Sequence, residues 1–391
     1  MDANATTSLS PEVFEAMRPY MLENFGNPSS IHYQGRQAHA AVEQGRGRVA
    51  ALLNCDRSEI VFTGGGTEGD NLAIFGLMRP GDHLITSTIE HHAVLHTAEH
   101  LQRRGIEVTF LPVGGGGAND SNACRVDPDD LRRAIQPNTR LISIMMANNE
   151  TGTIQAVEEI GKLAAEAEVY FHTDAVQAAG KLTIDVGRIG CDLLTIAGHK
   201  MYGPQGVGAL YVRRGTPLEP LFFGGAHERQ RRAGTENVAG IVGLGTAAEL
   251  AAAATDPGAP FNPSFGLSAL AKLRDRLENG ILARIEDSGV NAGNAPRVPN
   301  TTNLWFDHVD GEALFIALDL KGLAVSGGSA CASGAAEPSH VLTAMGLPKD
   351  RAKASLRYSL TQDSTEKEVD AAIELTTAAV GRLREIAPAY A

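Results

Sequence analysis

The sequence predicts an α/β fold in which a large domain, with a mostly parallel seven-stranded sheet covered by helices, is joined to a smaller α+β domain. Short apolar runs alternate with helical stretches through the first half of the chain, which is typical of a parallel sheet with helices on both faces. A proline-rich segment at residues 253–264 then breaks the pattern and indicates a domain boundary. We therefore expect residues 11–255 to form the large domain, and residues 1–10 together with 256–391 to form the small one.

The elements of the large domain follow from the hydrophobic periodicity of the chain. Two helices are expected first, over residues 11–24 and 29–54. The seven strands are expected at residues 59–63, 83–87, 108–113, 141–147, 169–173, 193–197 and 206–213. Helices at residues 67–78, 93–104, 128–135 and 157–168 separate the first five strands. Only a short loop precedes the last strand, so it cannot be reached by a parallel crossover and is expected to be antiparallel.

The small domain is expected to begin with a helix over residues 267–285. Strands are expected at residues 302–306 and 356–360, and a long helix from about Thr365. This order of elements is typical of an α+β arrangement.

Composition and charge exclude several classes of protein. Hydrophobic residues make up 43% of the 391 residues, which excludes a disordered chain. The net charge of −12 and the lack of a basic run argue against binding of duplex nucleic acid. The N-terminus does not resemble a secretory signal, and no apolar run approaches the length of a membrane span. The four cysteines contain no CxxC pair, so we expect a cytoplasmic protein without disulfides, a bound metal or a membrane anchor.

A glycine-rich loop at residues 63–69, TGGGTEG, follows a strand and opens a helix. Backbone N–H groups at such a position hold a phosphate, and the glycines let it approach closely. Gly64, Gly66 and Gly69 also fit the GxGxxG pattern, with Glu90 about 20 residues further on, as in dinucleotide-binding folds. An NAD-dependent oxidoreductase therefore stays open as an alternative, as does a tight structural turn.

Lys200 and Asp174 each follow an apolar strand. A lysine at a strand end is often a solvated edge residue, but Lys200 lies between His199 and a glycine-rich turn. Burial there would favour the neutral amine, which is a nucleophile. Ligands of open parallel sheets bind at the carboxyl ends of the strands, so both side chains are expected at one site. A phosphate loop, a Schiff-base lysine and a buried aspartate together are what pyridoxal phosphate requires.

Two further residues stand out as candidates for chemistry. His91, in the sequence EHHAV, is either a polar loop residue or a residue that lies flat on the ring of such a cofactor. Cys331 lies in SGGSACASG, where the small neighbours predict a mobile, exposed loop with a reactive thiol. Cys55, Cys124 and Cys191 are expected to be ordinary thiols. A protein that uses Cys331 alone to carry sulfur, without catalysis, is a further alternative.

The sequence resembles the cysteine desulfurases, pyridoxal phosphate enzymes of the class V aminotransferase group with fold type I. The resemblance extends along nearly the whole chain. It is carried by ATT (5–7), NFGNPSS (24–30), EIVFTGGGTEGDNLAI (59–74), NNETG (148–152), HTDAVQAAGKL (172–182), GHKMYGPQGVGALYVRR (198–214), RRAGTENV (231–238), SGGSACASGAAEPSHVL (326–342) and LRYSL (356–360). The cysteine motif is specific to this family, because other transaminases share the lysine and the aspartate but lack the cysteine.

The resemblance implies roles for the residues around the cofactor ring. Lys200 would form the Schiff base with pyridoxal phosphate and move the Cα proton of the substrate. Asp174 would pair with the pyridinium nitrogen, and His91 would stack on the ring. Gln177 would donate a hydrogen bond to the phenolic oxygen, and Asn149 would lie close by, on the cofactor and substrate side.

The resemblance also implies how the phosphate is held. Gly66, Thr67 and His199 would bind it, joined by Thr235 from the neighbouring subunit of a homodimer. Most family members have a serine that binds phosphate at the position of Ala197, so this chain lacks one hydroxyl donor.

The substrate and the reaction follow from the same resemblance. Arg357 would receive the carboxylate of L-cysteine, a bidentate contact suited to guanidinium. Cys331 would attack the substrate sulfur, keep it as a persulfide and release L-alanine. The sulfur would pass to an acceptor such as an iron–sulfur scaffold protein, for iron–sulfur cluster assembly or tRNA thiolation. A selenocysteine lyase, or another class V transaminase or lyase, is the nearest alternative.

Overall fold

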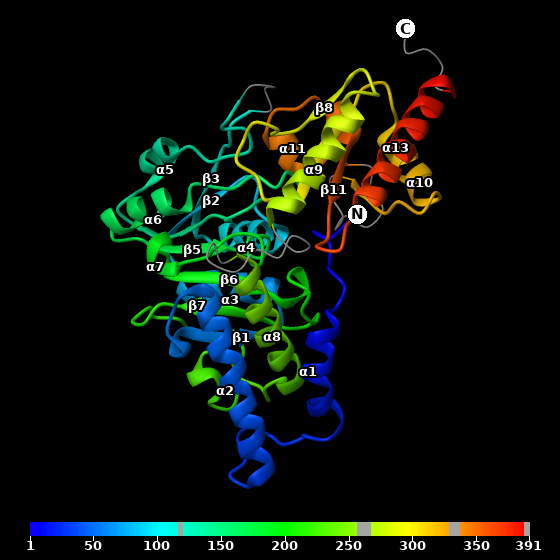
Figure 1. Cartoon of the computed structure of the whole chain (residues 1–391). Coiled ribbons are helices and arrows are strands. Elements are labelled where there is room, and N and C mark those ends of the chain that lie inside the picture. Colours follow the sequence, from blue (N-terminus) through cyan, green and yellow to red (C-terminus); the bar gives the residue numbers. More distant parts are fainter. Residues whose placement is uncertain (116–119, 256–266, 328–336, 387–391) are drawn as a thin grey trace.

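The computed structural model describes residues 1–115, 120–255, 267–327 and 337–386. Two sheets dominate it, a large one built from the first half of the chain and a small one near the C-terminus (Figure 1). The segment that carries Cys331 and most of the proline-rich segment at 253–264 lie outside the described residues. The exact division into domains therefore stays a prediction.

The large sheet has seven strands in the order β1-β7-β6-β5-β4-β2-β3. Their bounds are β1 (Ile60–Thr63), β2 (His83–Ser87), β3 (Glu107–Leu111), β4 (Thr139–Ser143), β5 (Tyr170–Asp174), β6 (Leu193–Ala197) and β7 (Gly208–Val212). Strands β2 to β6 pair in parallel, whereas β7 runs antiparallel to both β1 and β6. The predicted fold class is confirmed, including the antiparallel strand after the short loop.

Helices cover both faces of this sheet, and each face has its own cluster of buried apolar side chains. The predicted helices are found as α1 (Pro11–Leu22), α2 (Tyr33–Leu53), α3 (Gly66–Leu77), α4 (His92–Arg103), α5 (Pro128–Ala134) and α6 (Val157–Glu166). The short α7 (Val186–Ile189) and the long α8 (Val238–Thr255) were not predicted.

Helix α8 consists largely of glycine and alanine, and it packs on α1 and α2. The approach to α2 is so close that a Cβ atom on Gly245 would lie 2.6 Å from the Cα of Gly45. By length and composition alone α8 is apolar enough to cross a membrane, but most of the helix is buried in the structure. The small residues therefore serve close helix packing here.

The small sheet is antiparallel, with the strand order β10-β11-β9-β8. The strands are β8 (Ser288–Val290), β9 (Thr301–Phe306), β10 (Ser326–Gly327) and β11 (Ser355–Ser359). The helices around this sheet are α9 (Leu267–Leu282), α10 (Gly311–Asp319), α11 (His340–Ala344), α12 (Lys349–Lys353) and α13 (Glu366–Ile386). The sheet shares a separate apolar core with α9, α10 and α13. Helices α11 and α12 instead pack in a further cluster with Ile89 and Met145, which follow strands of the large sheet.

The N-terminal segment lies between the two sheets, and the N-terminus itself is beside β11 (Figure 1). Ala3 N donates to Ser359 O at 3.1 Å, whereas Thr7 N donates to His199 O at 2.9 Å. The first residues thus pair with the small sheet, and the following residues reach the loop after β6. This segment contributes directly to the site described next.

Candidate active site

A cavity of about 420 Å³ lies at the carboxyl ends of β5 and β6, where the sheet topology predicts a ligand. Most of the site residues predicted from the sequence line it. They are Gly66, Thr67, His91, Asn149, Asp174, Gln177, His199, Lys200 and Arg357. The structure therefore brings together residues that lie far apart in the sequence.

Lys200 ends the short 3₁₀ helix η2 (Gly198–Lys200), directly after β6. Its Nζ donates to Asn4 O at 2.6 Å and to Ala5 O at 2.7 Å. These carbonyl groups belong to the N-terminal segment, so that segment fixes where the amine lies in the cavity.

Asp174 is the last residue of β5, and its Oδ1 accepts a hydrogen bond from Val176 N at 2.8 Å. Burial raises the pKa of the Asp174 carboxyl to about 6. A second buried carboxyl, that of Asp70, also lines the cavity, and burial together with Asp174 raises its pKa. Within the described residues, Asp70 Oδ1 has no hydrogen-bond partner. A positively charged group beside Asp174 would favour the ionised form of this carboxyl, so Asp174 fits a protonated ring nitrogen.

His91 is the N-cap residue of α4, and its Nδ1 accepts a hydrogen bond from Ala93 N at 3.1 Å. Burial, with smaller contributions from His92 and Lys200, lowers the pKa of His91 to about 4. The ring is therefore neutral at pH 7 and carries its proton on Nε2. A neutral, half-buried imidazole at the cavity wall is suited to contact with an aromatic ring.

The phosphate end of the cavity is formed by the start of α3. Gly65 has φ +148°, a conformation that favours glycine, and Gly66 begins the helix. A Cβ atom on Gly66 would lie 2.8 Å from Val176 Cγ2, so a larger residue here would displace the Val176 side chain. His199 bonds through Nδ1 to Thr6 Oγ1 at 3.1 Å, and burial lowers its pKa to about 4. The free N–H groups of the helix N-terminus fit a phosphate.

Arg357 comes from β11 of the small sheet, and only 5% of the residue is exposed. Its Nη1 donates to Asn149 O at 3.0 Å, and its Nη2 donates to Asp2 Oδ1 at 2.7 Å. Its Nε is buried and has no partner among the described residues. The contacts with Asn149 and Asp2 use one N–H group of each Nη atom, so the guanidinium keeps donor capacity for a further acceptor in the cavity that Arg357 lines.

Two predicted residues are not in this cavity. Thr235 is exposed and does not line it within one chain. Cys331 lies outside the described residues. Of the other thiols, Cys55 and Cys124 have pKa values raised to about 12 by burial, and burial raises the pKa of Cys191 as well. Thiols in this state are poor nucleophiles at neutral pH.

Sequence analysis missed several residues that shape the site. Asn4, Glu150 and His340 line the cavity, and Asp2 holds Arg357. Asn4 stands directly before the ATT motif at 5–7, which is the one signal that pointed to this segment.

The dinucleotide alternative does not fit this geometry. The large sheet has a strand order other than the 3-2-1-4-5-6 order of the NAD-binding fold. Glu90, which would have to bind the ribose, is fully buried. Its carboxyl group accepts from Ser87 Oγ and Met145 N, so it faces the protein interior.

Comparison with known proteins gives the family. A family profile described as aminotransferase class V matches residues 1–372. The chain therefore belongs to the class V aminotransferases, whose members use pyridoxal phosphate as their cofactor.

"Cysteine desulfurase IscS" of Methanosarcina thermophila is 49% identical over 392 residues, covering 99% of this chain and 93% of that protein. "Cysteine desulfurase" of Trichormus azollae is 48% identical over 391 residues, covering 99% and 94%. Within the family, the chain thus groups with the cysteine desulfurases.

Solved structures agree with the sequence relatives. A structure described as a NifS-like protein has a TM-score of 0.86 and 33% identity, and the match covers 98% of this chain and 99% of the other. A structure described as SspA in complex with cysteine has a TM-score of 0.79 and 36% identity, covering 93% and 99%. The resemblance found in the motifs is therefore confirmed over the whole chain.

Proposed function

We propose that the protein is a cysteine desulfurase that converts L-cysteine to L-alanine and keeps the sulfur as a persulfide on Cys331. One observation carries this proposal: Lys200, Asp174, His91 and Arg357 line a single cavity in a chain that matches cysteine desulfurases from end to end. An oxidoreductase or a simple sulfur carrier would need no such combination of residues.

The cavity residues fit pyridoxal phosphate, which when bound supplies an electron sink for carbanion chemistry at the substrate Cα. Asp174 would pair with its ring nitrogen, and His91 would cover the ring. Gln177 would donate to its phenolic oxygen. The N-terminus of α3, with Gly66 and Thr67, would hold the phosphate together with His199.

Arg357 would bind the substrate carboxylate, because its contacts with Asn149 and Asp2 use one N–H group of each Nη atom and leave the second N–H groups for another acceptor. A carboxylate on a guanidinium forms charge-assisted hydrogen bonds, which also fix its orientation. Asn149 would thus support the substrate through its carbonyl contact with Arg357. Lys200, held at the Asn4 and Ala5 carbonyls, would take the proton from the substrate Cα.

Cys331 would act as the thiolate that attacks the substrate sulfur. The new S–S bond forms as the substrate C–S bond breaks, and the electron pair of that bond stays with the carbon skeleton. The skeleton takes up a proton and leaves as alanine. The net change moves one sulfur atom and needs no external oxidant.

We further propose a homodimer in the cytoplasm that passes its sulfur to an acceptor protein such as an iron–sulfur scaffold. Support for the dimer comes from apolar side chains that are exposed in one chain. They lie around α1, α2 and the loop before Thr235, and include Met21, Leu22, Phe25, Ile31 and Phe223. Thr235 does not reach the cavity of its own chain, as expected if it serves the partner.

Replacement of Lys200 tests the proposed function. The purified protein should be yellow with bound cofactor, and Lys200→Ala should lose both the native visible absorption and alanine release. Lys162→Ala, at an exposed lysine of α6, is the control and should keep both. Release of alanine from cysteine by Lys200→Ala at the wild-type rate would contradict the assignment.

A further inference from the structure

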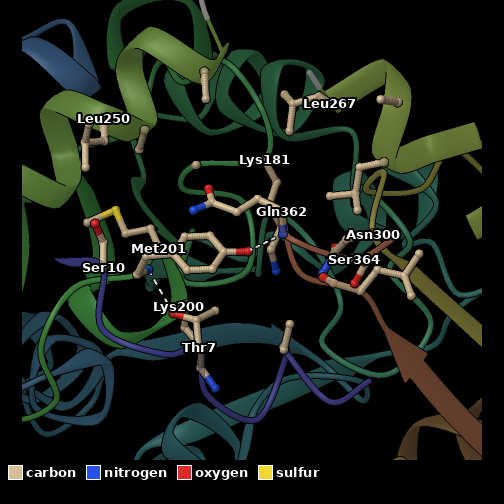
Figure 2. Close-up of a pocket in the computed structure, with 18 of the residues that line it drawn as sticks. Thr7, Ser10, Lys181, Lys200, Met201, Leu250, Leu267, Asn300, Gln362 and Ser364 are labelled. Atoms are coloured by element: carbon tan, nitrogen blue, oxygen red, sulfur yellow. Dashed lines mark hydrogen bonds between the residues drawn. The ribbon is translucent and has the colours of Figure 1, made fainter. Parts of the chain in front are cut away.

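Lys181 is a buried lysine that the reaction described above does not use. Only 8% of the residue is exposed. It lies on the wall of a second, smaller cavity of about 100 Å³, and Figure 2 shows it there with Lys200 and Asn300. Burial, with smaller contributions from Lys200 and Arg357, lowers the pKa of Lys181 to about 7. Burial of a lysine lowers the stability of the folded protein, so we expect a role that explains Lys181 at this position.

The contacts of Lys181 lead to the main cavity. Its Nζ donates to Gln177 Oε1 at 2.7 Å and to Asn4 Oδ1 at 3.1 Å. Both acceptors are amide oxygens, which accept hydrogen bonds and cannot donate them. The position of Nζ therefore decides which end of each amide faces it.

The orientation of the Gln177 amide follows from this contact. With Oε1 turned to Lys181, Nε2 points the other way and donates to Asn4 O at 3.0 Å. An amide nitrogen has two N–H groups, so one remains for a ligand in the cavity that Gln177 lines. A flipped amide would offer an oxygen there and leave its nitrogen against the Lys181 ammonium.

Asn4 links the same lysine to Lys200. The Asn4 side chain accepts from Lys181 and from Asn300 Nδ2 at 3.1 Å, and it donates to Thr301 Oγ1 at 2.8 Å. The Asn4 carbonyl accepts from Lys200 Nζ at 2.6 Å. One buried residue thus stands between Lys181 and the proposed Schiff-base lysine.

We infer that Lys181 is a positioning residue for the cofactor: it fixes the Gln177 amide with an N–H group toward the phenolic oxygen. The inference rests on the proposed function, since it takes the ligand of the cavity to be pyridoxal phosphate. A hydrogen bond donated to the phenolic oxygen stabilises negative charge there. If this hydrogen bond is lost, the bound cofactor releases its proton only at a higher pH.

The test is a pH titration of the visible absorption of the holoenzyme. In Lys181→Met, which keeps an unbranched apolar side chain and removes the donor, the midpoint should rise by about 1 pH unit. Lys162→Met makes the same change of charge on the surface and should leave the midpoint unchanged. Gln177→Leu should raise the midpoint as well, and Lys181→Met should add nothing in the Gln177→Leu background, because Lys181 acts through Gln177.

Three results would overturn the inference. The first is a Lys181→Met protein that unfolds like the wild type and has the wild-type midpoint. The second is a shift in the double variant equal to the sum of the two single shifts, which would assign Lys181 a role independent of Gln177. The third is a wild type that binds no pyridoxal phosphate, which would overturn the proposed function too. If Lys181→Met does not fold, Lys181→Leu, which also has no donor group, carries the same expectation.

Discussion

The side chain of Glu90, which precedes His91 in the sequence, is fully buried. Burial raises its pKa to about 8, partly offset by hydrogen bonds from Ser87 and Met145, while the charge of Asp174 raises it further. In the unfolded chain a glutamate ionises near pH 4.3. Between these two values the folded state holds one more proton than the unfolded state, so this residue makes stability fall as pH rises.

Glu90→Gln should remove that pH dependence, because the amide has the same shape and no charge. The difference in free energy of unfolding between the variant and the wild type should shift in favour of the variant by about 3–4 kcal/mol from pH 5 to pH 8. Urea unfolding at both pH values measures the difference. Glu99→Gln, at an exposed glutamate of α4, is the control and should not change the pH dependence. An identical pH dependence in Glu90→Gln and the wild type would show that Glu90 is ionised in the folded protein.

At the scale of elements, the turn η3 (His227–Gln230) holds three consecutive residues with positive φ. Glu228, Arg229 and Gln230 have φ values of 47°, 56° and 66°, which cost free energy for residues other than glycine. The turn is held by a buried ion pair, in which Arg46 Nη1 and Nη2 donate to Glu228 at 2.7 and 2.9 Å. Phe62 N of β1 donates to the same carboxylate at 3.0 Å. The pair therefore fixes a turn beside the strand that leads into the glycine loop.

Glu228→Ala should destabilise the protein by about 3 kcal/mol, because it leaves the buried Arg46 guanidinium with only Glu43, 2.8 Å from its Nε, as a charge partner. Asp370→Ala breaks an equally well-formed Arg276–Asp370 pair, at 2.8 Å for both contacts, that lies half-exposed on the surface. That control should cost at most about 1 kcal/mol. Equal losses in the two unfolding experiments would mean that burial of the Arg46–Glu228 pair does not matter.

The elements of the large domain could be predicted because each has a strong local signal. Parallel strands are apolar on both faces, and their intervening helices have a clear period. Helix α8 escaped prediction because its small residues give neither a helical stripe nor a strand pattern, and its stability comes from close packing on α2. The two-residue strand β10 has no sequence signal of its own, since it exists only through its pairing with β11.

The residues of the site also divide into those that could be predicted from the sequence and those that could not. Lys200 and Asp174 were predictable because parallel strands end at one edge of the sheet. Asp2, Asn4 and Lys181 were not, because their roles depend on where the N-terminal segment and the small sheet meet the large one. Their contacts join residues up to 355 positions apart.

For the molecule as a whole, the proposed dimer has a direct consequence for Thr235. In a homodimer with shared sites, Thr235→Ala should weaken pyridoxal phosphate binding by about 2–10-fold, since one hydrogen bond to the phosphate is lost. The affinity is measured by titration of the cofactor-free protein, and sedimentation should show a dimer. An active monomer, or an affinity unchanged by Thr235→Ala, would refute the shared site and leave the chemistry of Lys200 and Asp174 intact.

The central claim is that sulfur from L-cysteine moves to Cys331. Peptide mass mapping after incubation with L-cysteine, without reductant, tests it most directly. The peptide with Cys331 should carry one additional sulfur atom, and alanine should appear in step with it. Cys331→Ser should still bind pyridoxal phosphate but transfer no sulfur, because a hydroxyl group is hardly ionised at neutral pH. Additional sulfur found chiefly on Cys55, Cys124 or Cys191, or full sulfur transfer by Cys331→Ser, would contradict the account.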